Sequence, residues 1–244
     1  MYQQVLDVLR AALGGLHELN SYLDQGDWWF AAQHRGREVH VGLAGDGGRV
    51  TGLTYAAPLV PRTLQCNIEG TYVSHLTLPR VQTGDPEFDA RAHVHGAPPE
   101  IVQAALDGPT RRWILDTHVP PRPPQITTDH GFLGIYRCYR RTTRLLEIPP
   151  LEMPDAAEIA RWLDAALGLA DRLNGAFDAT YQGLQAQQGR AAAERWLAEQ
   201  HAAADQLARK RTTVRWIVFG AVAALFVLPL LAMLVIALLL LLSG

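Results

Sequence analysis

The fold class is decided by the stretch Trp28-Trp-Phe-Ala-Ala-Gln-His-Arg-Gly-Arg-Glu-Val-His-Val-Gly-Leu-Ala44. Two runs rich in aromatic and aliphatic residues flank the turn residues His34 to Arg37, which include Gly36. Short turns of this kind join neighbouring antiparallel strands. The pattern therefore predicts a β-hairpin, with one strand before the turn and one after it.

Further strands and helices are predicted on both sides of this hairpin. Apolar residues recur with helical spacing over residues 2–23, and Asp155 with Glu158 marks the start of another helix, which we expect to end near Gly175. Strands are predicted over residues 49–56, 63–78, 125–128 and 135–148, and short helices over residues 98–106 and 109–118. This order predicts an α+β domain over residues 1–176, with a small, largely antiparallel sheet and flanking helices.

A long polar helix is predicted over residues 177–214, where the continuous apolar stripe is lost. The next segment, residues 215–244, contains 27 residues without a charge, from Trp216 to Leu242. A helix of that length reaches roughly 40 Å, enough to cross a hydrocarbon core of ~30 Å. We therefore expect a helical stalk followed by a single transmembrane helix. The sequence is compatible with a stalk that stands free, lies back on the domain or pairs with a partner.

A basic cluster, which we call the collar, stands directly before the apolar run. Its members, together with the aromatic residue that follows, form the predicted membrane interface: Arg209, Lys210, Arg211, Arg215 and Trp216. No basic residue follows the run, so the positive-inside rule places the domain in the cytoplasm. Of the 22 basic residues, 21 are arginine, which we interpret as the coding bias of a GC-rich bacterial genome. We expect a single-pass, tail-anchored protein of a bacterial inner membrane.

Charge and cysteine content narrow the function classes. Without the collar the chain has 18 basic and 24 acidic residues, a net charge of −6, which disfavours nucleic acid as a partner. Cys66 and Cys138 are the only cysteines, and in a cytoplasmic domain we expect both as reduced thiols.

One motif resembles a known group of proteins. The residues Thr83-Gly-Asp-Pro-Glu-Phe-Asp89, followed by Val94 and Gly96, match the pattern T-G-D-P-x-F-D-x-x-F-x-V-x-G. This motif resembles that of bacterial membrane-associated proteins of unknown function. Ala92 departs from the pattern, which has a large apolar residue there. The resemblance implies a small α+β domain beside a membrane span, and it implies no activity.

The chemistry of the motif favours a structural role. Its first residues form a turn, Phe88 is expected in the core, and Asp89 is expected to cap backbone amides. Ala90 to Gly96 is predicted to alternate as a strand. We favour a turn cap for Asp89 and an ion pair for Arg91, and the alternative makes both residues a recognition surface.

Candidate catalytic residues are few. His93 and His95 have the i, i+2 spacing that some metal sites use, but no carboxylate or cysteine stands at a familiar ligand spacing, so we favour a solvated strand face. Ser21 and Ser74, the only serines before the apolar run, lie outside any nucleophile motif. Cys138 is expected as a core thiol. We therefore predict no catalytic residue, metal or cofactor.

Two surfaces could bind partners. Trp28 and Phe30 share one strand face and Trp29 lies on the other, which makes Trp29 a candidate interaction residue. The basic residues Arg137, Arg140, Arg141 and Arg144 are expected to pair with acidic side chains across the sheet, with lipid phosphates as the alternative.

The sequence thus predicts an interaction or scaffold module whose partners are the lipid bilayer and either another protein or a second copy. One alternative is a membrane-anchored, metal-dependent hydrolase that uses His93 and His95. The other is a homo-oligomer whose C-terminal helices associate through small residues, namely Gly220, Ala221, Ala223 and Ala224.

Overall fold

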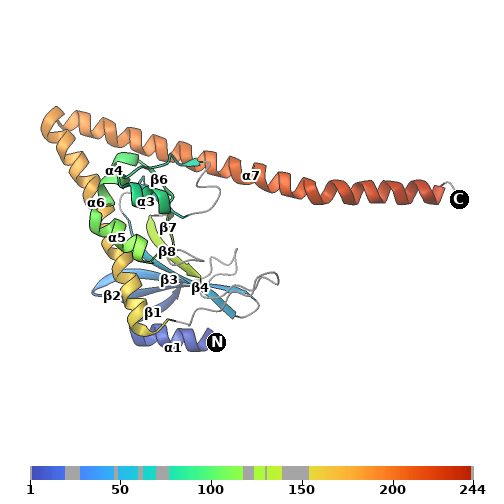
Figure 1. Ribbon diagram of the computed structural model, residues 1–244, viewed down its shortest axis with the longest axis horizontal. Helices are drawn as coiled ribbons and strands as arrows, with labels where there is room; N and C mark the ends of the chain where they lie inside the picture. The colour runs from blue at the N-terminus through green and yellow to red at the C-terminus, as the bar shows by residue number, and fades with distance from the viewer. Residues whose placement is uncertain are drawn as a thin grey trace.

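The computed structural model describes residues 2–19, 28–46, 49–59, 63–69, 77–117, 124–129, 131–138 and 154–242. The strands are β1 (Gly14–Leu19), β2 (Trp28–His34), β3 (Arg37–Asp46), β4 (Arg49–Pro58), β5 (Gln65–Ile68), β6 (Val94–Ala97), β7 (Gln125–Asp129) and β8 (Phe132–Cys138). The helices are α1 (Tyr2–Ala12), α3 (Pro86–Arg91), α4 (Pro99–Ala105), α5 (Gly108–Thr117), α6 (Ala156–Gln188) and α7 (Arg190–Leu242), as Figure 1 shows. The predicted α+β class is confirmed.

The strands form one eight-stranded sheet in the order β1-β2-β3-β4-β8-β7-β5-β6, and every strand pair in it is antiparallel. The predicted hairpin is β2–β3, in which Trp29 pairs with Gly42 and His34 with Arg37. Arg35 and Gly36, the two turn residues, both have positive φ angles, 51° and 74°. This is the backbone twist that two-residue hairpin turns need.

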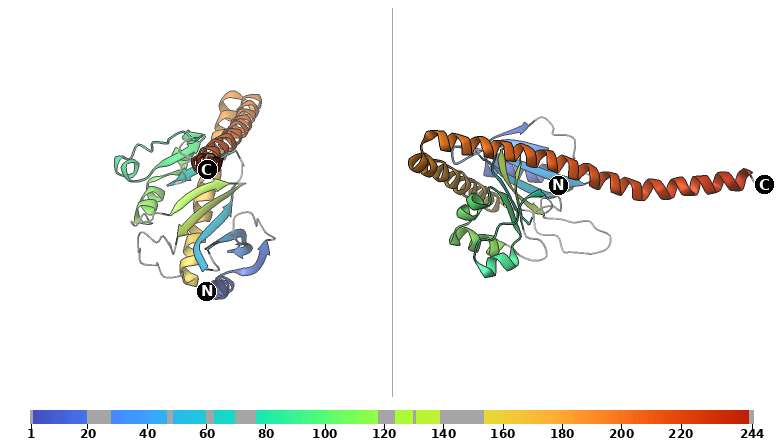
Figure 2. Two further views of the ribbon diagram at one scale, coloured as in Figure 1. Left: turned by 90° about the vertical axis from the view of Figure 1, so that its right-hand side faces the viewer. Right: turned by 90° about the horizontal axis from the view of Figure 1, so that it is seen from above.

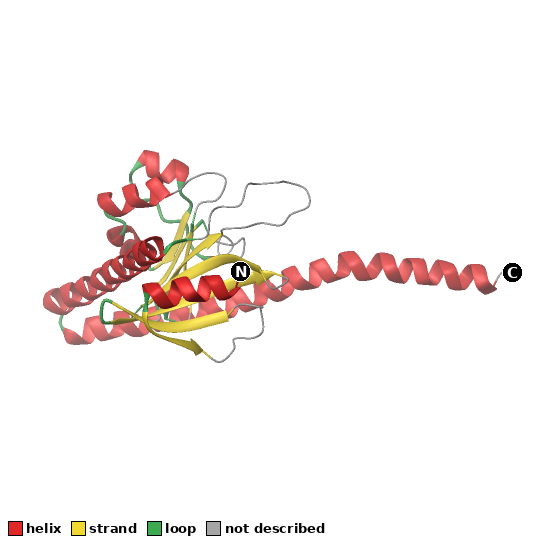
Figure 3. Ribbon diagram, turned by 90° about the horizontal axis from the view of Figure 1, so that it is seen from below, coloured by secondary structure: helices red, strands yellow, loops and turns green. Residues whose placement is uncertain are grey.

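The core lies between one face of the sheet and the helices. Helix α6 buries a stripe that includes Leu163, Ala166 and Leu173, each fully buried, against β4 and β8. At its start, Trp162 stacks on Tyr55 of β4 with ring centroids 6.2 Å apart and meets the edge of Trp113 of α5 at 6.0 Å. Helix α1 packs on α6 and lies across the strands in the view of Figure 3. The sheet residues that alternate with this core face point to the other side.

The N-terminal prediction of one helix over residues 2–23 is wrong. Helix α1 ends at Ala12, Gly14 begins strand β1, and Gly15 has a φ of 60°. The two glycines favour a break, and pairing with β2 then determines the conformation of residues 14–19. Residues 20–23 lie outside the described part of the chain.

Two further predicted strands are shorter than expected. The first of these is the strand predicted over Ala90–Gly96. Its first two residues belong instead to helix α3 (Pro86–Arg91), which Asp85 caps and in whose first turn Pro86 lies. Strand β6 starts only at Val94. In the stretch 63–78, predicted as a strand, residues 70–76 lie outside the described part of the chain. The described residues contain one strand, β5, and Glu69, directly after it, has a φ of 53°.

The predicted helix end at Gly175 is also wrong, because α6 continues to Gln188. The chain then turns at Gly189, which has a φ of 85°, and the start of α7 packs against the end of α6 before the two helices diverge (Figure 1). Two contacts fasten the start of α7: Ala193 is fully buried, and Trp196 packs on Phe177 with ring centroids 5.0 Å apart. The predicted stalk is therefore two helices that meet in an acute elbow, as Figures 1 and 2 show.

Helix α7 then extends away from the rest of the molecule (Figure 1). Among the residues whose side chains are described, every large hydrophobic side chain that is exposed lies on α7. These side chains are 63–73% exposed: Trp216, Ile217, Leu225 and Met233. Among the residues whose side chains the structure describes, no helix is both long enough and apolar enough to cross a membrane.

Some residues named in the sequence analysis lie outside the described part of the chain. They are Ser21, Ser74, Arg140, Arg141 and Arg144.

Candidate functional site

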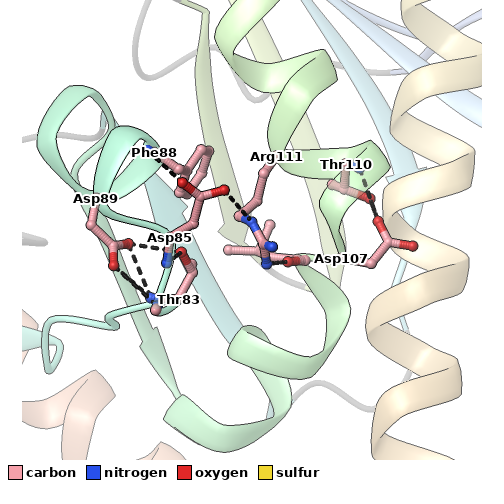
Figure 4. Close-up of polar contacts among 9 residues, drawn as sticks. Thr83, Asp85, Phe88, Asp89, Asp107, Thr110 and Arg111 are labelled. Carbon is pink, nitrogen blue, oxygen red and sulfur yellow. Dashed lines mark hydrogen bonds and ion pairs between the residues drawn. The ribbon is translucent and has the colours of Figure 1, made fainter.

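The Thr-Gly-Asp-Pro motif folds into a turn closed by Asp89. The Asp89 carboxylate accepts hydrogen bonds from the backbone N–H of Thr83 at 3.0 and 3.1 Å, from the Thr83 hydroxyl at 2.9 Å and from the backbone N–H of Gly84 at 3.1 Å (Figure 4). Phe88, between them in the chain, is fully buried. Both predictions, the turn cap and the core anchor, are confirmed.

A second set of contacts ties this turn to helix α5. Asp85 accepts from the backbone N–H of Phe88 at 3.2 Å and from Arg111 Nε at 3.2 Å, while Arg111 also donates to the carbonyl of Leu106 at 2.6 Å. Figure 4 shows Arg111 between the motif turn and the start of α5. Sequence reasoning missed this role of Arg111, since nothing in its spacing from Asp85 marks the pair.

Asp107 caps α5 and joins it to α6. Its carboxylate accepts from the Thr110 hydroxyl and from the Thr110 backbone N–H, the latter at 2.9 Å, and it lies 3.5 Å from Arg172 Nε. These contacts, the Thr110 hydroxyl first, lower the pKa of Asp107. The pKa of Asp89 is lowered as well: burial alone would raise it, but the hydrogen bonds from Thr83 and Gly84 and the charge of Arg80 outweigh that effect.

The motif therefore uses its acidic groups internally. Arg91 forms its ion pair with Glu87, one turn earlier, at 3.3 Å, and its side chain remains 48% exposed. To bind a partner, the Asp89 carboxylate would have to give up its hydrogen bonds from three donors, namely two backbone N–H groups and one hydroxyl. The exposed Arg91 would not.

The two candidate metal ligands have different surroundings. His93 is 54% exposed, and its backbone N–H donates to Glu69 Oε1 at 2.8 Å, with the imidazole 3.3 Å from the same oxygen. His95 is buried, and its Nδ1 lies 3.1 Å from the carbonyl of Leu78. Over the described residues, no group of three or more His, Cys, Asp or Glu side chains could hold a metal ion.

The two cysteines form no disulfide with each other. Burial raises the pKa of the Cys66 thiol to about 12, so it stays protonated at neutral pH. Cys138 is half-buried, and Arg137 beside it points to the opposite face, where its guanidinium lies 4.9 Å from the ring centre of Trp162. None of the described residues is a serine.

The hairpin turn is fastened to helix α6 by contacts that the sequence did not reveal. His34, which is buried, has Nε2 2.8 Å from Asp164 Oδ1, and Arg35 donates to the other oxygen at 2.6 Å. Arg37 makes two hydrogen bonds to Asp171, at 2.7 and 2.9 Å. The acidic partners stand 7 residues apart, two turns of one helix.

The sheet face turned away from α6 carries a row of aromatic rings. Trp29 lies against Gly42, where a Cβ would come within 2.9 Å of the indole, and Tyr136 lies against Gly52, where a Cβ would come within 2.6 Å of the ring. His40 stacks on Phe132 with ring centroids 4.3 Å apart. We call these four rings the aromatic face: Trp29, His40, Phe132 and Tyr136. All four are half-buried.

The collar lies on α7, about 20 residues beyond the elbow at Gly189. Arg209 and Lys210 are exposed, and Arg211 is half-buried. The hydroxyls of Thr212 and Thr213 donate to carbonyls one turn earlier, Ala208 at 3.1 Å and Arg209 at 3.0 Å. The helix continues without a break through Trp216.

Comparisons with known proteins add no identity to this geometry. No family model, curated protein or solved structure matches the chain.

Proposed function

We propose that this protein is a membrane-anchored interaction module whose α+β domain is held on the cytoplasmic side of a bacterial inner membrane by helix α7. One observation carries the proposal: α7 is a single helix that starts against α6, leaves the domain and continues into the charge-free run Trp216–Leu242. Its exposed apolar side chains would be unfavourable in water. A bilayer would bury them.

The orientation follows from the collar. Its four cations directly precede the apolar run, and such a cluster of Arg and Lys is typical of the cytoplasmic side of a span. The exposed indole of Trp216 suits the headgroup layer, where tryptophan is enriched.

The aromatic face supports the interaction role. Tryptophan and tyrosine are enriched at protein interfaces because they bury a large area at a small loss of side-chain entropy. Trp29 is half-buried and lies on a face that α6 does not cover. His34, His93 and His95, by contrast, contact carboxylates or backbone carbonyls in separate places.

The anchor is tested by disrupting the apolar run. Replacing Leu225 and Met233 with arginine adds two charges, each costing roughly 2.5–3.5 kcal/mol at the centre of a span. We expect the wild-type chain in the alkaline-resistant membrane fraction and the double variant outside it. An Ala202→Arg/Ala203→Arg variant, on an exposed part of the same helix, is the control. Equal extraction of all three proteins would contradict the anchor.

The interaction role is tested by cross-linking the full-length protein in its membrane and identifying the captured species by mass spectrometry. We expect one near-stoichiometric species, either another protein or a second copy, whose capture falls severalfold in Trp29→Ala. Arg112→Ala, on the exposed side of α5, is the control and should capture as wild type does. Capture that is equal in both variants would remove the aromatic face from the proposal.

A further inference from the structure

We propose that the collar is a binding site for the headgroups of anionic phospholipids, and that it gives an otherwise acidic protein a preference for anionic lipid. The inference rests on the proposed anchor and goes beyond it, because an apolar span inserts into neutral and anionic bilayers alike. A preference for anionic lipid therefore requires charged groups outside the span.

Helical geometry spreads the collar around α7. Successive residues of an α-helix are separated by about 100° around its axis, so Arg209, Lys210 and Arg211 cover about 200° of the circumference. Arg215 follows Arg211 by four residues and therefore lies on the same side one turn later. The six-residue rise from Arg209 to Arg215 is about 9 Å. That height is comparable with one headgroup layer, which accounts for about 5–8 Å on each side of the hydrocarbon core.

Two side chains of the collar are open to solvent. Arg209 and Lys210 are exposed, and Arg209 Nε donates to the backbone carbonyl of Asp205 at 3.4 Å, not to a carboxylate. A guanidinium with this contact keeps its charge available to a phosphate. Elsewhere arginines are joined to carboxylates, as Arg37 is to Asp171 and Arg190 is to Glu194.

The rest of the chain is acidic. Apart from the collar, the chain carries a net charge of −6, so an anionic surface repels it. Each collar cation near an anionic surface is expected to raise the affinity for that surface about fivefold. The attraction is confined to the collar, near the middle of α7, and it fades within about 10 Å at 0.1 M salt.

The experiment uses the full-length protein reconstituted into vesicles of equal parts phosphatidylglycerol and phosphatidylcholine. The readout is the ratio of the two lipids that remain bound when the protein is released in mild detergent. We expect at least a fivefold excess of phosphatidylglycerol for wild type, which declines as salt is raised. The variant Arg209→Gln/Lys210→Gln/Arg211→Gln/Arg215→Gln should show no excess.

A matched control removes four exposed arginines elsewhere, at Arg10, Arg112, Arg161 and Arg195, and changes the net charge equally. It should retain the lipid excess. No excess in wild type, or an equal excess in the collar variant, would overturn the proposal. Inorganic phosphate added at constant ionic strength should leave the excess unchanged, and displacement by it would show a site for free phosphate instead of lipid.

The anchor is measured separately on the same proteins. Alkaline extraction from vesicles of phosphatidylcholine alone reports insertion without any contribution from lipid charge. Resistance to extraction without a phosphatidylglycerol excess leaves the anchor standing and removes the collar site. Release of the wild-type protein from these vesicles contradicts the anchor itself.

Discussion

The indole of Trp29 on β2 lies so close to Gly42, its register partner on β3, that a Cβ at position 42 would come within 2.9 Å of ring carbon Cζ2. Real Cβ atoms do not approach a carbon this closely. The half-buried position of Trp29 therefore depends on a glycine across the strand pair, and the two residues form one unit of the aromatic face.

Replacing Gly42 with alanine should displace the indole and destabilise the domain by roughly 1–3 kcal/mol, the usual cost of overpacking. Urea unfolding, followed by far-UV circular dichroism, measures the change. In a Trp29→Ala background the same substitution meets no ring and should cost at least 1 kcal/mol less. An equal cost in both backgrounds would show that the contact with Trp29 is not the cause.

Asp89→Asn should destabilise the domain at neutral pH by about 1–2 kcal/mol, because the neutral amide accepts the three donors of the motif turn less well than a carboxylate. The pKa of Asp89 is lower in the folded state, so the contribution of its charge is fully present above the unfolded pKa of about 3.9. It is lost as the pH falls through that value and then through the lower folded pKa.

The measurement is the difference in unfolding free energy between wild type and Asp89→Asn from pH 7 down to pH 3. The difference should shrink as the pH falls below about 4. Asp116→Asn, an exposed residue of α5, is the control for the general effect of removing one carboxylate. A difference that stays constant over this range would rule out a role for the Asp89 charge.

The parts of the fold that rest on local chemistry could be predicted from the sequence. Gly36 and its neighbours defined the hairpin, and Asp155 does cap α6, accepting from the backbone N–H of Glu158 at 2.7 Å. Asp89 was identified as a turn cap because such caps reach only a few residues along the chain. Local rules failed at Gly175, which lies inside a continuous helix because packing on both sides of it outweighs the helix propensity of one glycine.

The contacts between distant segments could not be predicted. His34 and Asp164 are 130 residues apart, and no periodicity relates them. The same holds for Asp85 and Arg111, and for the pairing of aromatic rings with Gly42 and Gly52 across strands. These relationships exist only once the strand register and the placement of α6 are determined.

The hairpin contacts with α6 should differ in strength. Asp164→Ala leaves the buried His34 imidazole without its carboxylate and should cost about 1–3 kcal/mol. Asp171→Ala removes an ion pair whose side chains are 42% and 54% exposed, and should cost less than about 1 kcal/mol. Urea unfolding of the two variants and of His34→Ala/Asp164→Ala provides the comparison. Equal costs for Asp164→Ala and Asp171→Ala would contradict the buried histidine as the cause.

The elbow between α6 and α7 should depend on one glycine. Gly189 has φ 85° and ψ 165°, a conformation that is essentially restricted to glycine, so Gly189→Ala should cost about 1–3 kcal/mol. Gly183 lies in the interior of α6 with no atom within 4 Å of an added Cβ, so the same substitution there should stabilise the protein by up to about 1 kcal/mol.

The pair of variants separates backbone strain from any general effect of adding a methyl group to this region. Limited proteolysis should report the elbow directly: Gly189→Ala should be cleaved between α6 and α7 faster than wild type, and Gly183→Ala should not. Trp196→Ala, which removes the contact with Phe177, should be cleaved faster as well, because the start of α7 loses its aromatic packing on α6. If Gly189→Ala instead matched Gly183→Ala in stability and cleavage, the turn between the helices would tolerate an ordinary side chain and the elbow would not be set by this residue.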